Sequence, residues 1–245
     1  MTAEPDRIAI GTVEALYRYP VKSMGGEALD FVDLSWAGID GDRQFAFYRT
    51  GDHSRFPWFT GRMIPDTVLY RSRYADSANP RGSTVRVVTP AGEELDIRDE
   101  ALRAILAGLA GEDIRLIQVG RGNFDAMPVS VITTATREKI EQRAGRPVDI
   151  RRFRPNIVIR PDSMAAAEAD WCGGTLVFGA ASLSASHPNE RCSFITVDPD
   201  SAAKDVKLLR IVAQDFNNCV GIYCTTARAG RIALGDRVFL SRPAA

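Results

Sequence analysis

Histidine and cysteine are scarce in this sequence. Its 245 residues include two histidines, His53 and His187, and four cysteines, none of them in a C-x-x-C pair. The histidine count excludes a metal site built from several imidazoles, and the cysteine spacing argues against a zinc ribbon or a thioredoxin-type motif. A metal bound through cysteine would therefore have to use a single protein thiolate.

Excess charge and long apolar runs are also missing. Lys and Arg total 31 and Asp and Glu total 31, so the formal net charge is zero. A nucleic-acid-binding protein usually carries a basic excess, so we expect no nucleic-acid partner, although a local basic patch could still bind a small anion. No apolar run is long enough to cross a bilayer, and residues 1–7 begin no signal-type stretch. We therefore expect a cytoplasmic protein without a membrane segment.

Short strand-like segments dominate the sequence. The connections between them are short and rich in Gly, Pro and Asp, which favours a mainly β protein with α+β elements and barrel-like closure. Two helices are expected, one at 99–109 ending before Gly111 and one at about 134–144 with Thr134 or Thr136 as its N-cap. The expected strands lie at 8–13, 15–19, 29–36, 44–48, 84–89, 95–97, 156–160, 175–178, 181–185, 194–197, 221–226 and 238–241.

Cys192 is the cysteine with the most informative neighbours. It follows Arg191 and precedes the expected strand at 194–197. The adjacent guanidinium favours a thiolate, which could act as a nucleophile or a ligand for a soft metal, whereas a free cysteine more often packs as a small buried residue. A cysteine hydrolase that pairs Cys192 with His187 is a further alternative, while no Gly-x-Ser-x-Gly elbow supports a serine hydrolase. Two other cysteines are expected to be packing residues: Cys219 and Cys224.

Two segments carry groups suited to an anion. Lys22 and Ser23 precede a double glycine at 25–26, which together offer a cation, a hydroxyl and backbone N–H groups, although a solvated surface lysine explains Lys22 as well. Arg154 and Asn156 lie two residues apart near an expected strand, so they would share one face. Such a face fits a phosphate or the edge of a heterocycle, with an RNA surface as the rival. Another guanidinium follows a turn: Arg43.

Several short motifs occur in the order typical of one family. They are Tyr19–Ser23, Gly41–Arg43, Phe153–Ile159, Arg191–Cys192, Thr196–Asp200, Gly221–Tyr223 and Gly230–Asp236. This ordered set resembles the MOSC proteins, named for the C-terminal domain of molybdenum cofactor sulfurase, and among them the amidoxime-reducing branch. The resemblance covers nearly the whole chain.

The resemblance implies a molecule of two domains with a molybdopterin-type molybdenum cofactor between them. An N-terminal β-rich domain over residues 1–105 would pack on a C-terminal MOSC β-barrel over residues 106–245. Cys192 would be the one protein thiolate bound to molybdenum. The residues implied to hold or flank the cofactor's phosphate and pterin are Lys22, Ser23, Arg43, Asp125, Arg154, Asn156, Arg191 and Tyr223.

The implied activity is the reduction of N-hydroxylated small molecules from N–OH to N–H. Asp198 is a candidate proton relay, although its Val-Asp-Pro-Asp context equally suits a structural turn. Because the sequence has no cysteine cluster for an iron–sulfur centre, we expect a separate electron-donor protein of flavoprotein, iron–sulfur or cytochrome type. The alternatives are a carrier of sulfur or of the molybdenum cofactor without reductase turnover, and a plain anion- or RNA-binding β protein.

Overall fold

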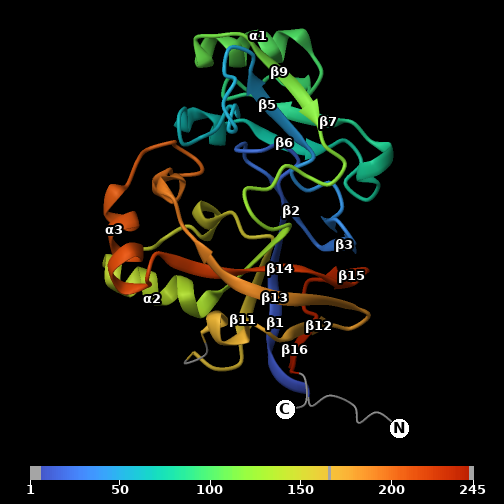
Figure 1. The fold of residues 1–245 in the computed structure, drawn as a ribbon, viewed down its shortest axis with the longest axis vertical. Helices are drawn as coiled ribbons and strands as arrows, with labels where there is room; N and C mark the ends of the chain where they lie inside the picture. The colour runs from blue at the N-terminus through green and yellow to red at the C-terminus, as the bar shows by residue number, and fades with distance from the viewer. Residues whose placement is uncertain (1–6, 165–166, 243–245) are drawn as a thin grey trace.

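The computed structural model describes residues 7–164 and 167–242. The molecule has two parts stacked along its long axis (Figure 1). One part holds small sheets and helix α1 (Glu100–Ala110). The other part holds a β-barrel with helices α2 (Thr134–Ala144) and α3 (Val206–Asp215) beside it.

The barrel is a closed ring of seven strands. Their order is β11, β10, β14, β13, β12, β16 and β1, and a further pairing of β1 with β11 completes the ring. Closure gives every strand two neighbours and leaves no open edge. The strand bounds are β1 (Arg7–Arg18), β10 (Val129–Thr133), β11 (Ile157–Pro161), β12 (Thr175–Phe178), β13 (Ala181–Glu190), β14 (Cys219–Arg228) and β16 (Arg237–Ser241).

Apolar side chains on alternate strand positions fill the barrel. Leu16, Val131 and Ile159 belong to this buried cluster. β10 is buried along its whole length because its outer face packs on a second cluster that contains Ile140 of α2 and Leu208 of α3. The two helices therefore cover the outside of the barrel at β10.

The other part consists of small antiparallel sheets. β5 (Phe45–Arg49) pairs with β9 (Ile114–Gln118), and a second sheet contains β6 (Arg71–Tyr74), β7 (Val85–Val88) and β8 (Glu94–Asp96). Leu102 and Leu106 of α1 pack into the core between these elements. The remaining strands are β2 (Glu27–Leu29), β3 (Phe31–Ser35), β4 (Gly38–Ile39) and β15 (Gly230–Ala233), and the 3-10 helices are η1 (Pro65–Leu69), η2 (Pro80–Gly82), η3 (Ile150–Phe153), η4 (Glu168–Trp171) and η5 (Ser193–Thr196).

The predicted mainly β architecture with a barrel is confirmed, and both predicted helices are present. Asp99 caps α1 by accepting a hydrogen bond from the backbone of the second helical residue, and Gly111 ends the helix in the left-handed conformation. The N-cap of α2 is Thr133 rather than Thr134 or Thr136, because the Thr133 hydroxyl accepts from Thr136 N at 3.1 Å.

One local prediction is wrong, and one helix is absent from the expected elements. The segment predicted as a strand at 194–197 forms η5, in which Val197 N donates to Phe194 O at 3.1 Å. Helix α3 was not predicted, although Leu208 and Val212 give it a buried apolar face. Within residues 7–164 and 167–242, no helix is long and apolar enough to cross a membrane.

Hydrogen-bonded strand pairs cross the predicted boundary between residues 105 and 106. β1 precedes this boundary but pairs with β11 and β16, and β9 follows it but pairs with β5. The sheets therefore join the two halves of the sequence, and the division of the chain at residue 105 stays a prediction.

Candidate cofactor site

A cavity of about 610 Å³ is lined by residues from both parts of the molecule. Nine of the ten residues singled out from the sequence line it: Lys22, Ser23, Arg43, Asp125, Arg154, Asn156, Arg191, Cys192 and Tyr223. The tenth, Asp198, does not. The fold thus brings together groups that lie as far apart in the sequence as Lys22 and Tyr223.

Lys22 is a fixed cation in the cavity wall. Its backbone N–H donates to Phe45 O at 2.8 Å, which attaches the segment after β1 to β5. Its Nζ donates to Asp125 Oδ1 at 2.6 Å and to Asn123 O at 3.2 Å. Burial lowers the pKa of Lys22, and the neighbouring Asp125 opposes that shift.

Three residues of the cavity wall have left-handed backbone conformations without being glycine. The φ angles are 70° for Ser23, 50° for Arg43 and 47° for Arg154. Each such conformation costs about 1–2 kcal/mol, and strain of this kind gathers at functional sites. The backbone is therefore bent at three of the positions that face the cavity.

The guanidinium of Arg43 is held from several sides. It forms an ion pair with the buried Asp42 and donates to Arg154 O at 3.1 Å. The other carboxylate oxygen of Asp42 accepts from Tyr19 N at 2.8 Å. The orientation of Arg43 is therefore set by residues of the chain before any ligand binds.

Arg154 has a buried donor without a partner. Its Nη1 donates to Met24 O at 2.7 Å, whereas no donor or acceptor of the described residues contacts its buried Nη2. Burial and the charge of Arg43 lower the pKa of Arg154 to about 10, so the guanidinium is charged at neutral pH. An unpaired buried donor costs about 1–3 kcal/mol, and an anionic ligand would satisfy it.

Arg191 and Cys192 follow the end of β13. Arg191 donates from Nη1 to Phe153 O and from Nε to Val220 O, both at 2.8 Å. Burial lowers the pKa of Arg191 to about 10. Cys192 is exposed and lines the cavity, so its thiol is accessible to a ligand there.

The side chain of Asn156 forms its hydrogen bonds within the protein. It is fully buried, its Oδ1 accepts from Ser130 N at 3.0 Å and its Nδ2 donates to Tyr17 O at 3.3 Å. Its Oδ1 also lies 3.4 Å from Nη1 of Arg43. Asn156 therefore links β10 to β1 and helps to orient Arg43.

Tyr223 and Asn189 form a polar wall near Arg191. The amide orientation that satisfies both polar atoms of Asn189 lets it donate to Tyr223 Oη at 3.2 Å and accept from Arg191 at 3.0 Å. The Tyr223 ring centre lies 5.6 Å from that of His187. Burial raises the pKa of Tyr223, so its hydroxyl keeps its proton at neutral pH.

Positive charge predominates in the cavity wall. Two acidic residues, Asp125 and Glu190, face six cationic ones: Lys22, Arg43, Arg62, Arg152, Arg154 and Arg191. Among the described residues, no three His, Cys, Asp or Glu side chains gather where they could hold a metal ion. The donor set therefore fits an anionic group that brings further metal ligands of its own, with Cys192 as a single soft ligand.

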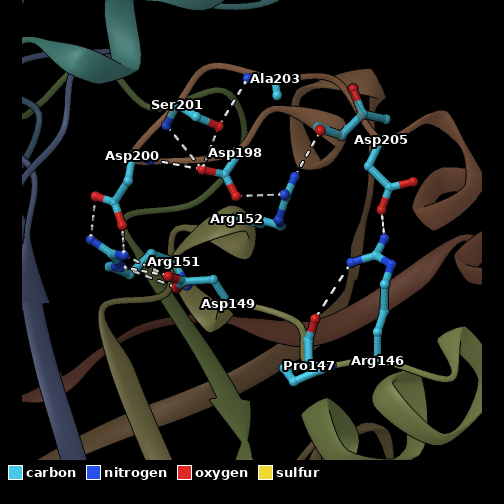
Figure 2. Close-up of polar contacts among 11 residues, drawn as sticks. Arg146, Pro147, Asp149, Arg151, Arg152, Asp198, Asp200, Ser201, Ala203 and Asp205 are labelled. Carbon is cyan, nitrogen blue, oxygen red and sulfur yellow. Dashed lines mark hydrogen bonds and ion pairs between the residues drawn. The ribbon is translucent and has the colours of Figure 1, made fainter.

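Asp198 lies in a turn outside this cavity. Figure 2 shows its carboxylate accepting hydrogen bonds from the backbone of Asp200 and from Ser201, and pairing with Arg152 at 2.7 Å. These contacts are those of a structural turn. The proton-relay role predicted for Asp198 has no support from its position.

Two sequence interpretations of the anion-binding segments need correction. Arg154 precedes β11 at the left-handed end of η3, so it does not share a strand face with Asn156. The double glycine at 25–26 does not offer both N–H groups to a ligand, because Gly25 N donates to Tyr70 O at 2.9 Å. A Cβ at Gly26 would lie 2.3 Å from Arg18 O, so close backbone packing explains that glycine.

Several lining residues were not found from the sequence. Phe56, Thr60 and Arg62 come from an irregular segment without periodicity, and Ser130 and Asn189 are single polar residues in strands. The only signal for the first group was an arginine close to aromatic residues in a loop. Lys22 Nζ and Arg62 Cζ lie 6.0 and 4.7 Å from the Phe56 ring centre, which places this loop at the cation-lined cavity.

The fold and cavity define a two-part β protein whose closed barrel presents an exposed thiol and a set of cations to one cavity. The sequence matches the MOSC N-terminal beta barrel domain over residues 10–112 and the MOSC domain over residues 119–239. The chain therefore belongs to the MOSC proteins.

Curated relatives and one solved structure agree with this assignment. The chain is 24% identical to mitochondrial amidoxime reducing component 2 of Bos taurus over 94% of its own length and 83% of that protein, and the Homo sapiens protein of the same name gives the same three values. The crystal structure of the YuaD protein from Bacillus subtilis superposes with a TM-score of 0.55 at 16% identity, covering 98% of this chain and 100% of that one. This last similarity concerns the fold alone.

Proposed function

We propose that the chain binds a molybdopterin-type molybdenum cofactor and reduces N-hydroxylated compounds. The observation that carries the proposal is that the exposed Cys192 thiol and the partnerless donor of Arg154 belong to the same cation-lined cavity. Relatives named amidoxime reducing component support the reaction class. The net reaction converts N–OH, two electrons and two protons into N–H and water.

The residues of the cavity would divide into two groups. Lys22, Ser23, Arg43 and Arg154 would hold the phosphate and pterin through charge-assisted hydrogen bonds. The Cys192 thiolate would be the protein ligand of the metal, since soft thiolates suit a metal already held by sulfur. When bound, the cofactor supplies the two-electron chemistry, while the protein supplies orientation and electrostatics.

The cavity that the Cys192 thiol lines also contains a candidate for proton delivery, the hydroxyl group of Tyr223. Tyr223 keeps its hydroxyl protonated at neutral pH because burial raises its pKa, and Asn189 holds that hydroxyl at 3.2 Å. We assign Tyr223 to proton delivery in the cavity wall in place of Asp198. The electrons would come from a separate donor protein.

The test compares two cysteines that line the same cavity. Cys192→Ala should lose stoichiometric molybdenum and at least about 100-fold in the rate of benzamidoxime reduction with a reduced chemical donor, because the metal loses its protein ligand. Cys219→Ala is the matched control and should keep both properties. Elemental analysis of freshly purified protein from a cofactor-competent host measures the metal directly.

The same experiment distinguishes a reductase from a protein that only carries sulfur or the molybdenum cofactor. Undiminished turnover in the Cys192→Ala variant would refute the role of that thiol. Wild-type protein that retains molybdenum, or carries a persulfide on Cys192, but reduces no N-hydroxylated compound with any donor would identify a carrier instead.

A further inference from the structure

A second, smaller cavity lies next to the one described above. It has a volume of about 180 Å³ and shares three wall residues with the larger cavity: Arg152, Arg154 and Phe194. Of the residues assigned to the cofactor, Arg154 alone lines this space. Its further walls come from β1 and β2, from the double glycine at 25–26 and from the segment after η5.

Arginine side chains supply the positive charge in the wall of this second cavity. Four arginines line it, Arg71, Arg151, Arg152 and Arg154, and none of its lining residues, all within the described part of the chain, is Asp or Glu. Figure 2 shows Arg151 between Asp149 and Asp200 and Arg152 paired with Asp198. Arg71 also pairs with Asp200, at 3.1 Å. These ion pairs orient three of the four guanidinium groups, whereas Arg154 pairs with no carboxylate among the described residues and keeps its partnerless Nη2.

Aromatic and apolar side chains form the other walls. The rings of Tyr17 and Tyr19 lie 6.4 Å apart with an angle of 31° between their planes, and Phe194 lines the same space. Val68 and Val197 add aliphatic surface. A cavity of about 150 Å³ accommodates benzene in another protein, so this space suits one aromatic ring.

The Tyr19 hydroxyl lacks a hydrogen-bond partner. Tyr19 is 3% exposed and lines the second cavity, and no donor or acceptor of the described residues contacts its Oη. Burial raises the pKa of Tyr19, so the hydroxyl keeps its proton and can donate. A native protein seldom leaves such a buried hydroxyl unsatisfied.

We propose that the second cavity is a binding site for a small aromatic carboxylate. The ring would lie among Tyr17, Tyr19 and Phe194, and the carboxylate would meet the arginines, with Tyr19 as a donor. The ligand is chemically distinct from an N-hydroxylated amidine, because its recognition depends on negative charge. The site is separate from the thiol of Cys192, and Arg154 forms part of the wall between the two cavities.

Calorimetric titration of the full chain in phosphate-free buffer tests this site, with sodium benzoate as the probe. Benzoate should bind at least about tenfold more tightly than benzyl alcohol, which lacks the charge, and than acetate, which lacks the ring. Tyr19→Phe should weaken benzoate binding about tenfold, the effect of losing one hydrogen bond to a charged group. Ala28→Trp should abolish it, because Ala28 is exposed, lines the cavity and pairs with Tyr17 across the strands.

Arg62→Ala is the matched control, because Arg62 lines only the larger cavity. It should leave benzoate affinity unchanged. Loss of benzoate binding in Arg62→Ala with retention in Ala28→Trp would place the probe in the larger cavity and refute the proposal. Equal affinity for the three probes, or no binding, would refute it as well, and unchanged affinity in Tyr19→Phe would refute the role of the hydroxyl.

Discussion

The guanidinium carbon of Arg154 lies 4.1 Å from the centre of the Tyr19 ring. The guanidinium carbon of Arg43 lies 4.9 Å from the centre of the same ring. Two guanidinium groups that repel each other therefore contact one buried aromatic ring. Cation–π attraction offsets part of that repulsion, and the left-handed backbone at both arginines keeps them in place. The pair is thereby prepared for an anion before one arrives.

Replacing Arg154 by methionine should separate anion binding from folding. Arg154→Met keeps an unbranched apolar stem but removes the charge and the partnerless donor, so phosphate affinity should fall about 10- to 100-fold. Thermal unfolding with increasing inorganic phosphate measures this: the phosphate-dependent rise in melting temperature should disappear. Arg160→Met, at an exposed arginine, should retain it. Equal responses in the two variants would contradict the assignment.

Tyr19→Phe should stabilise the protein in the absence of ligand. The substitution removes a buried hydroxyl without a partner and keeps the ring under Arg154, so the free energy of unfolding should rise by about 1 kcal/mol. Tyr74→Phe is the control, since Tyr74 is also buried but donates to Gly41 O at 3.1 Å, and it should lose about 1 kcal/mol. Urea denaturation compares them, and similar losses in both would disprove the prediction.

Gly221→Ala should disturb the site through the backbone. Gly221 has a φ of 76°, and a Cβ there would lie 2.6 Å from Val131 O and 3.3 Å from Arg191 Nη2. We expect a loss of at least about 2 kcal/mol, which combines left-handed strain with the clash. Gly145 has a φ of 66°, and a Cβ placed there meets no atom within 4 Å. Gly145→Ala should therefore lower the free energy of unfolding by only about 1 kcal/mol. Chemical denaturation of the two variants isolates the contribution of the clash.

Asp198→Asn should affect stability rather than proton transfer. The substitution weakens the turn at 198–201 and the ion pair with Arg152, and we expect a loss of about 1–2 kcal/mol. The dependence of turnover on pH should keep its shape. A shifted pH profile at unchanged stability would restore Asp198 as a proton relay.

The pair formed by Lys22 and Asp125 predicts a dependence of stability on pH. Burial acts to raise the pKa of Asp125, but Lys22 and Arg43 lower it overall below its ordinary value of 3.8. A carboxyl with a depressed folded-state pKa stabilises the protein above its unfolded-state pKa and loses that contribution as pH falls through the folded-state value. Asp125→Asn should therefore be less stable than wild type at neutral pH, and the difference should vanish in strong acid. A constant difference in urea denaturation at both pH values would contradict this.

The sequence predicted those elements whose signals are local. α1 shows both its apolar period and its cap, Asp99, so its bounds were nearly correct. The sequence predicts a strand at 194–197 because Phe194, Ile195 and Val197 are typical strand residues, whereas the surrounding packing selects the 3-10 helix η5. The pairing of β1 with β11 joins residues far apart in the chain, and no local pattern specifies it.

The site was predicted where short motifs mark it and missed where they do not. Lys22, Arg154 and Cys192 stand in recognisable motifs, and all three line the cavity. Thr60 and Arg62 line the cavity from an irregular loop, where an arginine close to aromatic residues is too weak a pattern to predict their participation. The left-handed backbone conformation of Arg154 could not be predicted from the sequence either, because non-glycine residues seldom adopt it.

The barrel is closed by the first and the last of the described strands. β1 pairs with β16 in a register that joins Arg7 to Ser241, so this pair cannot form before the chain has been made as far as residue 241. Until then the stretch of β1 from Arg7 to Thr12 lacks that neighbour, although β2 and β11 become available earlier. Ring closure is consequently a late folding event of high contact order, and chaperone protection of this unpaired edge would matter most in that interval.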